Sequence, residues 1–241
     1  MSSAVFMKIF QQAEKTFSNR NRDCYKANFA VLKKLVDKLV YSDLKLNPFL
    51  FSQKAFKVKT FSFRLSSFQN KAPCTFVNIY EKLDSPFSMS IFIIDENYKM
   101  PLHDHPNMTG ILKVISGKLK AECYTQITTD KENGLLEKIV QVEQPKILTE
   151  TSEAAVLYPD NCNYHELTAL EGPAAFFDIL SPPYSDISDS SPNARHCSFF
   201  KKEKIMVDNS GLNPTVKLTQ IPVPDHYYCD SVYYEQPDFM R

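Results

Sequence analysis

The 241-residue sequence contains little glycine, no tryptophan and no net charge. It holds only five glycines, and Lys+Arg and Asp+Glu both number 28. The balanced charge gives no sign of the basic stripe that nucleic-acid binding requires, so we expect no nucleic-acid partner. No apolar run approaches the roughly 18–20 residues of a membrane-spanning helix, which argues against a membrane partner as well.

Closely spaced cysteine pairs are also missing. The six cysteines are far apart, at positions 24, 74, 123, 162, 197 and 229, and none forms a C-x-x-C pair. The opening residues, MSSAVFMKIF, lack a basic stretch followed by an unbroken apolar segment, so we expect no secretory signal. These features indicate a reducing compartment with free thiols, and they disfavour a cysteine-based zinc site. We expect a cytoplasmic protein. The excess of basic residues in residues 1–41, eight against three acids, leaves mitochondrial import as the alternative.

The sequence pattern changes along the chain. In residues 25–41 apolar residues recur at spacings of three and four, which predicts a helix with one apolar face, and residues 4–17 do so less regularly. Asn47-Pro48 is expected to end this helical part. From residue 74 onward, short β-branched and aromatic runs separated by Pro, Gly, Asn and Asp predict strands. The predicted strands are 75–81, 89–94, 109–115, 118–126, 137–142, 154–158, 164–169 and 174–180, with later candidates at 197–201 and 227–234.

Many short strands at this spacing indicate a mainly β fold, an antiparallel barrel or sandwich. We expect one globular domain overall, in which residues 1–48 form a helical N-terminal segment and residues 49–241 form the β domain. Asn133-Gly134 is predicted to be a hairpin tip. Residues 183–196 and 206–216 are expected to be loops.

Histidines suggest where the chemistry takes place. Two of the five lie in MPLHDHP, residues 100–106, and an extended chain there would place His103 and His105 on the same face. His165 lies 60 residues beyond His105, at the start of a predicted strand and directly after PDNCNY. Three histidine ligands with open positions are typical of a catalytic metal site. An H-x-H pair alone is common by chance, however, and ordinary core or surface histidines are the alternative.

Two further residues are candidates for a site. Asp178 lies in the apolar run AAFFDIL, where a buried carboxylate needs a partner. It is a candidate for orienting a substrate amine or a ligand nitrogen, and the alternative is a structural carboxylate bonded to backbone amides. Tyr184 follows Pro-Pro, and a tyrosine at the start of a loop is often a packing residue.

The histidine arrangement resembles the two motifs of the cupin superfamily. In the first motif, H-x-H is usually followed by a Glu ligand and then, after six residues, by Gly. Here Gly117 occupies the expected position, but position 110 is itself Gly. The second motif, Pro-x-Gly, two residues and then His, is one residue longer here and has Asn161 in place of Gly. The resemblance implies a cupin-type antiparallel β-barrel (a double-stranded β-helix) with three neutral His ligands and no carboxylate ligand.

Longer strings are similar to one family of thiol dioxygenases, the cysteamine (2-aminoethanethiol) dioxygenases and plant cysteine oxidases. These strings are MPLHDHPNMTGILKVISGKLKAECY (100–124), HELTALEGPAAFFDILSPPY (165–184) and RHCSFF (195–200). The resemblance implies that Fe(II) is held by His103, His105 and His165. It also implies that Asp178 and Tyr184 are pocket residues with catalytic roles.

The chain departs from the family pattern at two places. The family usually has Gly after HDHP, where this chain has Asn107. It often has Cys-His-Tyr-Tyr where this chain reads Cys197-Ser198-Phe199-Phe200, so a tyrosine hydroxyl is absent there. The first change is expected to affect the turn and the pocket rim, and neither touches the three histidines.

The function that the resemblance implies is addition of both atoms of dioxygen to a thiol, which gives a sulfinic acid. The expected partners are dioxygen and either a small thiol such as cysteamine or a peptide with an N-terminal cysteine, and we expect a monomer. A peptide substrate would make the protein an oxygen sensor for protein turnover. The alternative is a non-catalytic metal-binding cupin with a regulatory or interaction role. A zinc hydrolase ranks last, because Asp104, the one acid beside the histidines, is expected on the opposite strand face.

Overall fold

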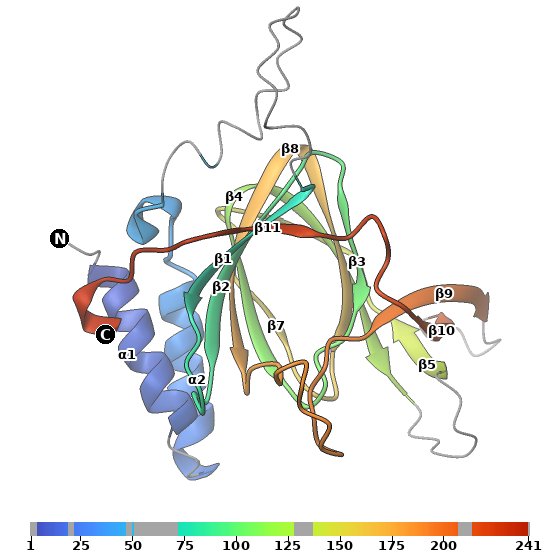
Figure 1. The fold of residues 1–241 in the computed structure, drawn as a ribbon, viewed down its shortest axis with the longest axis horizontal. Coiled ribbons are helices and arrows are strands. Elements are labelled where there is room, and N and C mark those ends of the chain that lie inside the picture. The colour runs from blue at the N-terminus through green and yellow to red at the C-terminus, as the bar shows by residue number, and fades with distance from the viewer. Residues whose placement is uncertain are drawn as a thin grey trace, which may run out of the picture.

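The fold is a β-barrel with two helices packed on one side (Figure 1). The structure, a computed structural model, describes residues 4–18, 22–46, 50, 72–127, 137–206 and 214–240. The helices are α1 (Ala4–Ser18) and α2 (Arg22–Val36), and two short 3-10 helices are η1 (Tyr41–Leu44) and η2 (Asp238–Met240). Within the described ranges, no helix has the length and apolar character that crossing a membrane requires.

Both helices form where apolar residues recur at helical spacing. In α1 the buried side chains include Phe6, Ile9 and Phe10, and in α2 they include Leu32 and Val36. The prediction that the second helix runs to residue 41 is wrong, because α2 ends at Val36. The Asp37 amide still bonds four residues back to Lys33, but the amides of Lys38 and Leu39 bond three residues back to Leu35 and Val36, so the chain tightens into turns.

The strands pair antiparallel, except that β1 and β11 pair in parallel. The strands are β1 (Cys74–Tyr80), β2 (Ser88–Ile94), β3 (Lys99–His103), β4 (Thr109–Gln126), β5 (Glu137–Val142), β6 (Lys146–Thr149), β7 (Ala155–Leu157), β8 (Tyr164–Ser181), β9 (Phe199–Met206), β10 (Thr215–Ile221) and β11 (Cys229–Val232). Their order in the sheet is β11-β1-β2-β8-β3-β9-β10-β5-β4-β6, and both β7 and β8 pair with β4. The fold is therefore mainly β with a cupin-type barrel, as expected.

Two pairs of predicted strands are each one continuous strand. Residues 109–115 and 118–126 lie together in β4, and 164–169 and 174–180 lie together in β8. Gly117 does not end its strand but forms an irregularity in β4, where the register against β8 shifts on both sides of Ser116. Its φ is 78°, and an added Cβ would lie 2.4 Å from the Pro173 carbonyl oxygen, so glycine is required at this position.

Three strands, β3, β6 and β10, were not predicted. β3 contains Pro101, which argues against a strand in sequence reasoning, and β6 is only four residues long. The prediction of a loop over 206–216 is partly wrong, because β9 reaches Met206 and β10 begins at Thr215. β10 has only two buried side chains, Val216 and Leu218, and these pack in a small separate core. The expected ends and turns at Asn47-Pro48 and Asn133-Gly134 lie outside the described residues.

Alternating side chains give the sheet of β1, β2, β8 and β4 two different faces. On the outer face, Ile91 and Phe177 belong to the same core cluster as the helix residues Phe6 and Phe10. The rings of Phe6 and Phe177 meet edge to face with their centroids 6.2 Å apart. The helices therefore cover the outer face, and the inner face is left to line the barrel interior.

Candidate metal centre

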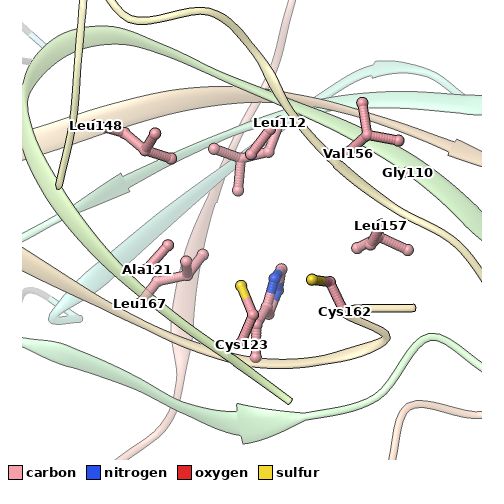
Figure 2. Close-up of a pocket in the computed structure, with 11 residues that line it drawn as sticks. Gly110, Leu112, Ala121, Cys123, Leu148, Val156, Leu157, Cys162 and Leu167 are labelled. Atoms are coloured by element: carbon pink, nitrogen blue, oxygen red, sulfur yellow. The ribbon is translucent and has the colours of Figure 1, made fainter. Parts of the chain in front are cut away.

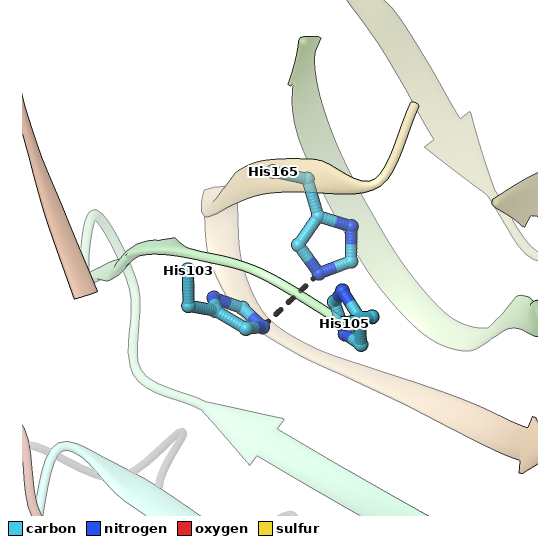
Figure 3. Close-up of side chains that lie close together, drawn as sticks. All are labelled: His103, His105 and His165. Atoms are coloured by element: carbon cyan, nitrogen blue, oxygen red, sulfur yellow. Dashed lines mark hydrogen bonds between the residues drawn. The ribbon is translucent and has the colours of Figure 1, made fainter. Parts of the chain in front are cut away.

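Three histidines from three separate positions in the chain meet inside the barrel (Figure 3). His103 is the last residue of β3, His105 follows in the next loop, and His165 is near the start of β8. All three are buried, with exposed fractions of 8%, 2% and 6%. One nitrogen from each lies within 4.8 Å of the other two, so the side chains form a group that could hold one metal ion.

Backbone carbonyls fix the orientation of two of these rings. His103 Nδ1 lies 2.8 Å from the Pro101 carbonyl oxygen, and His105 Nδ1 lies 3.0 Å from the Asn163 carbonyl oxygen. A carbonyl oxygen only accepts, so each Nδ1 carries the proton and donates it. In the neutral ring Nε2 is then the atom with a free lone pair, and this is the form that binds a metal.

The surroundings keep the three imidazoles neutral. Burial is the main cause and lowers the pKa of His103 to about 4, although its bond to Pro101 acts in the opposite direction. Burial, helped by the charge of His103, lowers the pKa of His105 to about 3. Burial and the two other histidines hold the pKa of His165 well below its usual range.

The spacing fits a shared ion. The Nε2 atoms of His103 and His165 are 3.2 Å apart. Two nitrogens bound to one ion at about 2.1 Å each, roughly at right angles, would lie about 3 Å apart. Position 110, where cupins usually supply a carboxylate ligand, is Gly110 in β4. The donor set in this structure is therefore three neutral nitrogens, which suits a divalent transition metal.

Asparagine 163 contributes to the site and was missed by sequence reasoning. Its buried side chain accepts a hydrogen bond from the His105 amide (3.1 Å) and donates to the His105 carbonyl oxygen (2.8 Å) and the Tyr158 carbonyl oxygen (3.0 Å). With its own carbonyl on His105 Nδ1, Asn163 fixes both the backbone and the ring of one ligand. The available sequence signal was a polar residue two positions before His165 in the string PDNCNYH.

The histidines form part of the wall of a cavity of about 240 Å³. Asp178, in the middle of β8, also lines it and is buried, with an exposed fraction of 6%. Burial raises the pKa of Asp178 to about 7, although a hydrogen bond from the Ile179 amide acts against the rise. The Nδ1 atoms of His103 and His105 bond to backbone carbonyl oxygens, so Asp178 is not the partner that orients these two rings.

Tyr184 lines the same cavity but its hydroxyl bonds to the backbone. The hydroxyl donates to the Asp104 carbonyl oxygen at 2.6 Å, and the ring lies 5.7 Å from that of His105. Burial raises the pKa of Tyr184 well above its usual range. The Asp104 carboxylate accepts a hydrogen bond from the Ser198 amide at 2.8 Å. Tyr184 thus anchors the backbone of Asp104, which lies between His103 and His105 in the sequence.

The two departures from the family pattern have clear structural counterparts. Asn107 has a φ of 57°, in the left-handed region that glycine adopts most easily and asparagine tolerates. The turn therefore keeps a positive φ without glycine. Phe199 pairs with His103 between β9 and β3 and lines the cavity, so an apolar ring stands where a hydroxyl is common in the family.

A second, smaller cavity of about 20 Å³ lies beside the first, and His165 and Leu167 line both. Figure 2 shows its apolar lining, with the sulfur atoms of Cys123 and Cys162 directed into it. Gly110 is part of this wall, and an added Cβ there would lie 2.9 Å from Leu157 Cγ and Leu180 Cδ2. Leucine side chains thus occupy the space beside position 110.

A cupin barrel with three histidines directed into one cavity defines a metal-binding cupin of the kind that has catalytic members. The PCO_ADO family model matches residues 35–239, and the chain belongs to this family.

Named relatives agree with this assignment at modest identity. The chain is 28% identical to human (Homo sapiens) 2-aminoethanethiol dioxygenase, over 87% of this chain and 80% of that one. It is also 28% identical to the mouse (Mus musculus) protein of the same name, over 98% and 96%. Identity to plant cysteine oxidase 2 of Arabidopsis thaliana is 26%, over 80% of this chain and 64% of the relative.

Proposed function

We propose that this protein is an iron(II)-dependent thiol dioxygenase. It adds both oxygen atoms of O₂ to the sulfur of cysteamine or of the N-terminal cysteine of a peptide, so that R–SH and O₂ give R–SO₂H. The observation that carries the proposal is the meeting of three neutral imidazoles on the wall of a cavity that also holds a carboxylate. Membership of the PCO_ADO family and the names of the relatives support it.

The ligand set proposed for the iron is His103, His105 and His165. Bound iron(II) would supply the redox chemistry that dioxygen requires and a positive charge that favours the thiolate form of the substrate. Because all three ligands are neutral, none of them offsets that charge. The hydrogen bonds of Asn163 and of the Pro101 carbonyl oxygen hold the rings in the orientation that this role needs.

Asp178 and Tyr184 are assigned different tasks. Both proposed substrates carry an amine close to the thiol, and the Asp178 carboxylate would pair with its ammonium group. Such a pair lowers the pKa of the carboxyl group and keeps it charged at neutral pH. Tyr184 acts as a positioning residue, because its hydroxyl is already bonded to the Asp104 carbonyl oxygen.

The deciding experiment is anaerobic reconstitution with iron(II), followed by admission of air and mass spectrometry of the substrates. Cysteamine and an N-terminal-cysteine peptide are tested separately, and metal-free and zinc-loaded protein are the controls. A gain of two oxygen atoms that depends on iron supports the proposal. The absence of any gain on both thiols, with iron demonstrably bound, would overturn it in favour of a non-catalytic cupin.

A further inference from the structure

A row of polar residues crosses the inner face of the barrel next to the metal centre. Asn78 of β1 is the direct register partner of Ser90 in β2, and Ser90 is the partner of Asp178 in β8. Directly opposite residues in antiparallel strands share a face, so the three side chains form one row. All three line the metal-site cavity. The row therefore leads from the carboxylate near the histidines outward to β1.

An aromatic row runs beside it. Phe76, Phe92 and Phe176 are register partners on the same three strands, two residues along from the polar row. Their ring centroids are 5.1 Å apart between Phe76 and Phe92 and 5.4 Å apart between Phe92 and Phe176. These rings also line the cavity. One wall of the cavity thus offers hydrogen-bonding groups and an apolar surface side by side, as an extended peptide requires.

The cavity adjoins a polar groove at the end of the polar row. The groove has a volume of about 400 Å³ and six lining residues, two of which, Asn78 and Glu81, also line the metal-site cavity. The rest of its lining comes from the chain around β11, including Tyr233 and Gln236. The cavity alone, at about 240 Å³, is much larger than cysteamine needs, since a water molecule takes roughly 10–15 Å³ on the same measure.

Glu81 places a negative charge where the two spaces meet. Its carboxylate accepts a hydrogen bond from Asn78 Nδ2 at 3.2 Å, and within the described part of the chain it forms no ion pair. The neighbouring cation, Lys82, is directed elsewhere, with Nζ bonded to the Met240 carbonyl oxygen at 3.1 Å. A positively charged side chain in the groove would thus have a carboxylate to meet.

We propose that the groove is a subsite for the chain that follows an N-terminal cysteine, and that Glu81 selects a lysine or arginine within the three residues after that cysteine. The inference rests on the proposed thiol dioxygenase function. Neighbouring strands are about 4.8 Å apart, so β1 lies about 10 Å from β8, a distance that an extended peptide spans in about three residues. The substrate class is accordingly a basic N-terminal-cysteine peptide in preference to a small thiol.

The test uses iron-loaded full-length protein and peptides that begin with cysteine. Lysine is placed at position 2, 3 or 4, and each peptide is paired with one that has glutamine at that position. The readout is the ratio of kcat/KM between the lysine and glutamine peptides. We expect about two- to fivefold in favour of lysine at one or more positions, the range of a solvent-accessible ion pair, and a smaller ratio at high salt.

Three variants test whether the lysine-to-glutamine ratio of kcat/KM depends on the Glu81 carboxylate. E81Q, which keeps the acceptor for Asn78, is expected to bring the ratio to about one, and E81K, which repels a lysine peptide, is expected to bring it below one. E235Q is the matched control, because Glu235 is an exposed acid beside the groove residues Tyr234 and Gln236 and lines neither space. It is expected to keep the wild-type ratio.

Different outcomes separate the two proposals. A ratio of one at all three positions, or a preference for lysine that persists in E81Q, overturns the subsite. Oxidation of cysteamine without oxidation of any peptide also overturns the subsite but leaves the thiol dioxygenase intact. If iron-loaded protein oxidises no thiol at all, the proposed function itself fails.

Discussion

His103 and His165 are direct partners in the antiparallel pairing of β3 with β8, and their Nε2 atoms are 3.2 Å apart. The closeness of these two imidazoles is therefore a product of strand register. A shift of one residue in either strand would turn one of the rings to the opposite face of the sheet. His105 joins them because the Asn163 side chain and carbonyl oxygen hold it from the turn before β8.

Replacing His165 with alanine is expected to abolish iron binding and thiol oxidation, with a loss of activity greater than about 100-fold. The fold should be retained, because a smaller side chain at the cavity wall leaves the β8 backbone bonds in place. Iron content and turnover are the measurements. H196A is the control, since His196 is exposed and its ring bonds to the Asp189 carbonyl oxygen, away from the three histidines of the site. Full iron retention with full turnover in H165A would remove the central assignment.

Replacing Asn163 with alanine is expected to weaken iron binding about 10- to 100-fold without removing any ligand. The change leaves the buried amide and carbonyl groups of His105 without their side-chain partner, which costs about 1–3 kcal/mol of stability. Metal titration measures the iron affinity, and urea denaturation measures the loss of stability. The exposed Asn193→Ala is the control. Wild-type iron affinity in N163A would show that the side-chain bonds to the His105 backbone are not needed to position this ligand.

Gly110→Ala tests why the usual carboxylate position of cupins is a glycine here. The added Cβ would meet Leu157 and Leu180 at 2.9 Å, so both leucines must shift. We expect a loss of about 1–2 kcal/mol in the free energy of unfolding, typical of mild overpacking. Thermal and urea unfolding are the measurements. Gly172→Ala is the comparison variant, because an added Cβ there meets nothing within 4 Å while φ is 121°, so its effect comes from backbone strain without crowding. An unchanged stability would mean that the leucines move freely.

Tyr184→Phe removes the hydroxyl that bonds to the Asp104 carbonyl oxygen and keeps the ring against His105. The Asp104 carbonyl oxygen loses its donor, so we expect a loss of about 1 kcal/mol in stability. For a positioning residue we expect kcat to fall with little change in KM, and the pH profile of kcat to keep its shape. A changed pH profile would instead indicate that the hydroxyl itself transfers a proton. Unchanged kinetics would contradict both roles.

The histidine pair, the third histidine and the barrel class could be predicted from local sequence, because H-x-H spacing and strand alternation are short-range signals. The shared orientation of His103 and His165 could not, since it depends on how β3 and β8 pair, and the two histidines are 62 positions apart in the sequence. β3 was hidden by Pro101, and β10 by the small number of residues that it buries. Asn163 was missed for a similar reason: its role follows from contacts with His105, 58 residues away.

Asp178 gives the metal-free protein a specific dependence of stability on pH. Burial raises its pKa in the folded protein from the ordinary 3.8 to about 7. Between these values the folded protein retains a proton that the unfolded chain has released, so stability falls as the pH rises through this window. Below about pH 4 Asp178 does not lower the free energy of unfolding. Above about pH 7 the loss caused by ionising this buried group is complete, on the order of 4 kcal/mol at most.

Asp178→Asn removes this titration, so metal-free D178N should gain stability over the wild type as the pH rises from about 5 to 8. Urea denaturation of both proteins across that range gives the difference, and other groups, such as the buried histidines, cancel in it. Asp160→Asn is the control, because Asp160 is exposed in the turn that follows β7. Parallel stability curves for D178N and the wild type would show that Asp178 is not a buried titrating group. The carboxyl group would then be ionised at neutral pH even in the empty cavity, and pairing with an amine would not be needed to keep it charged.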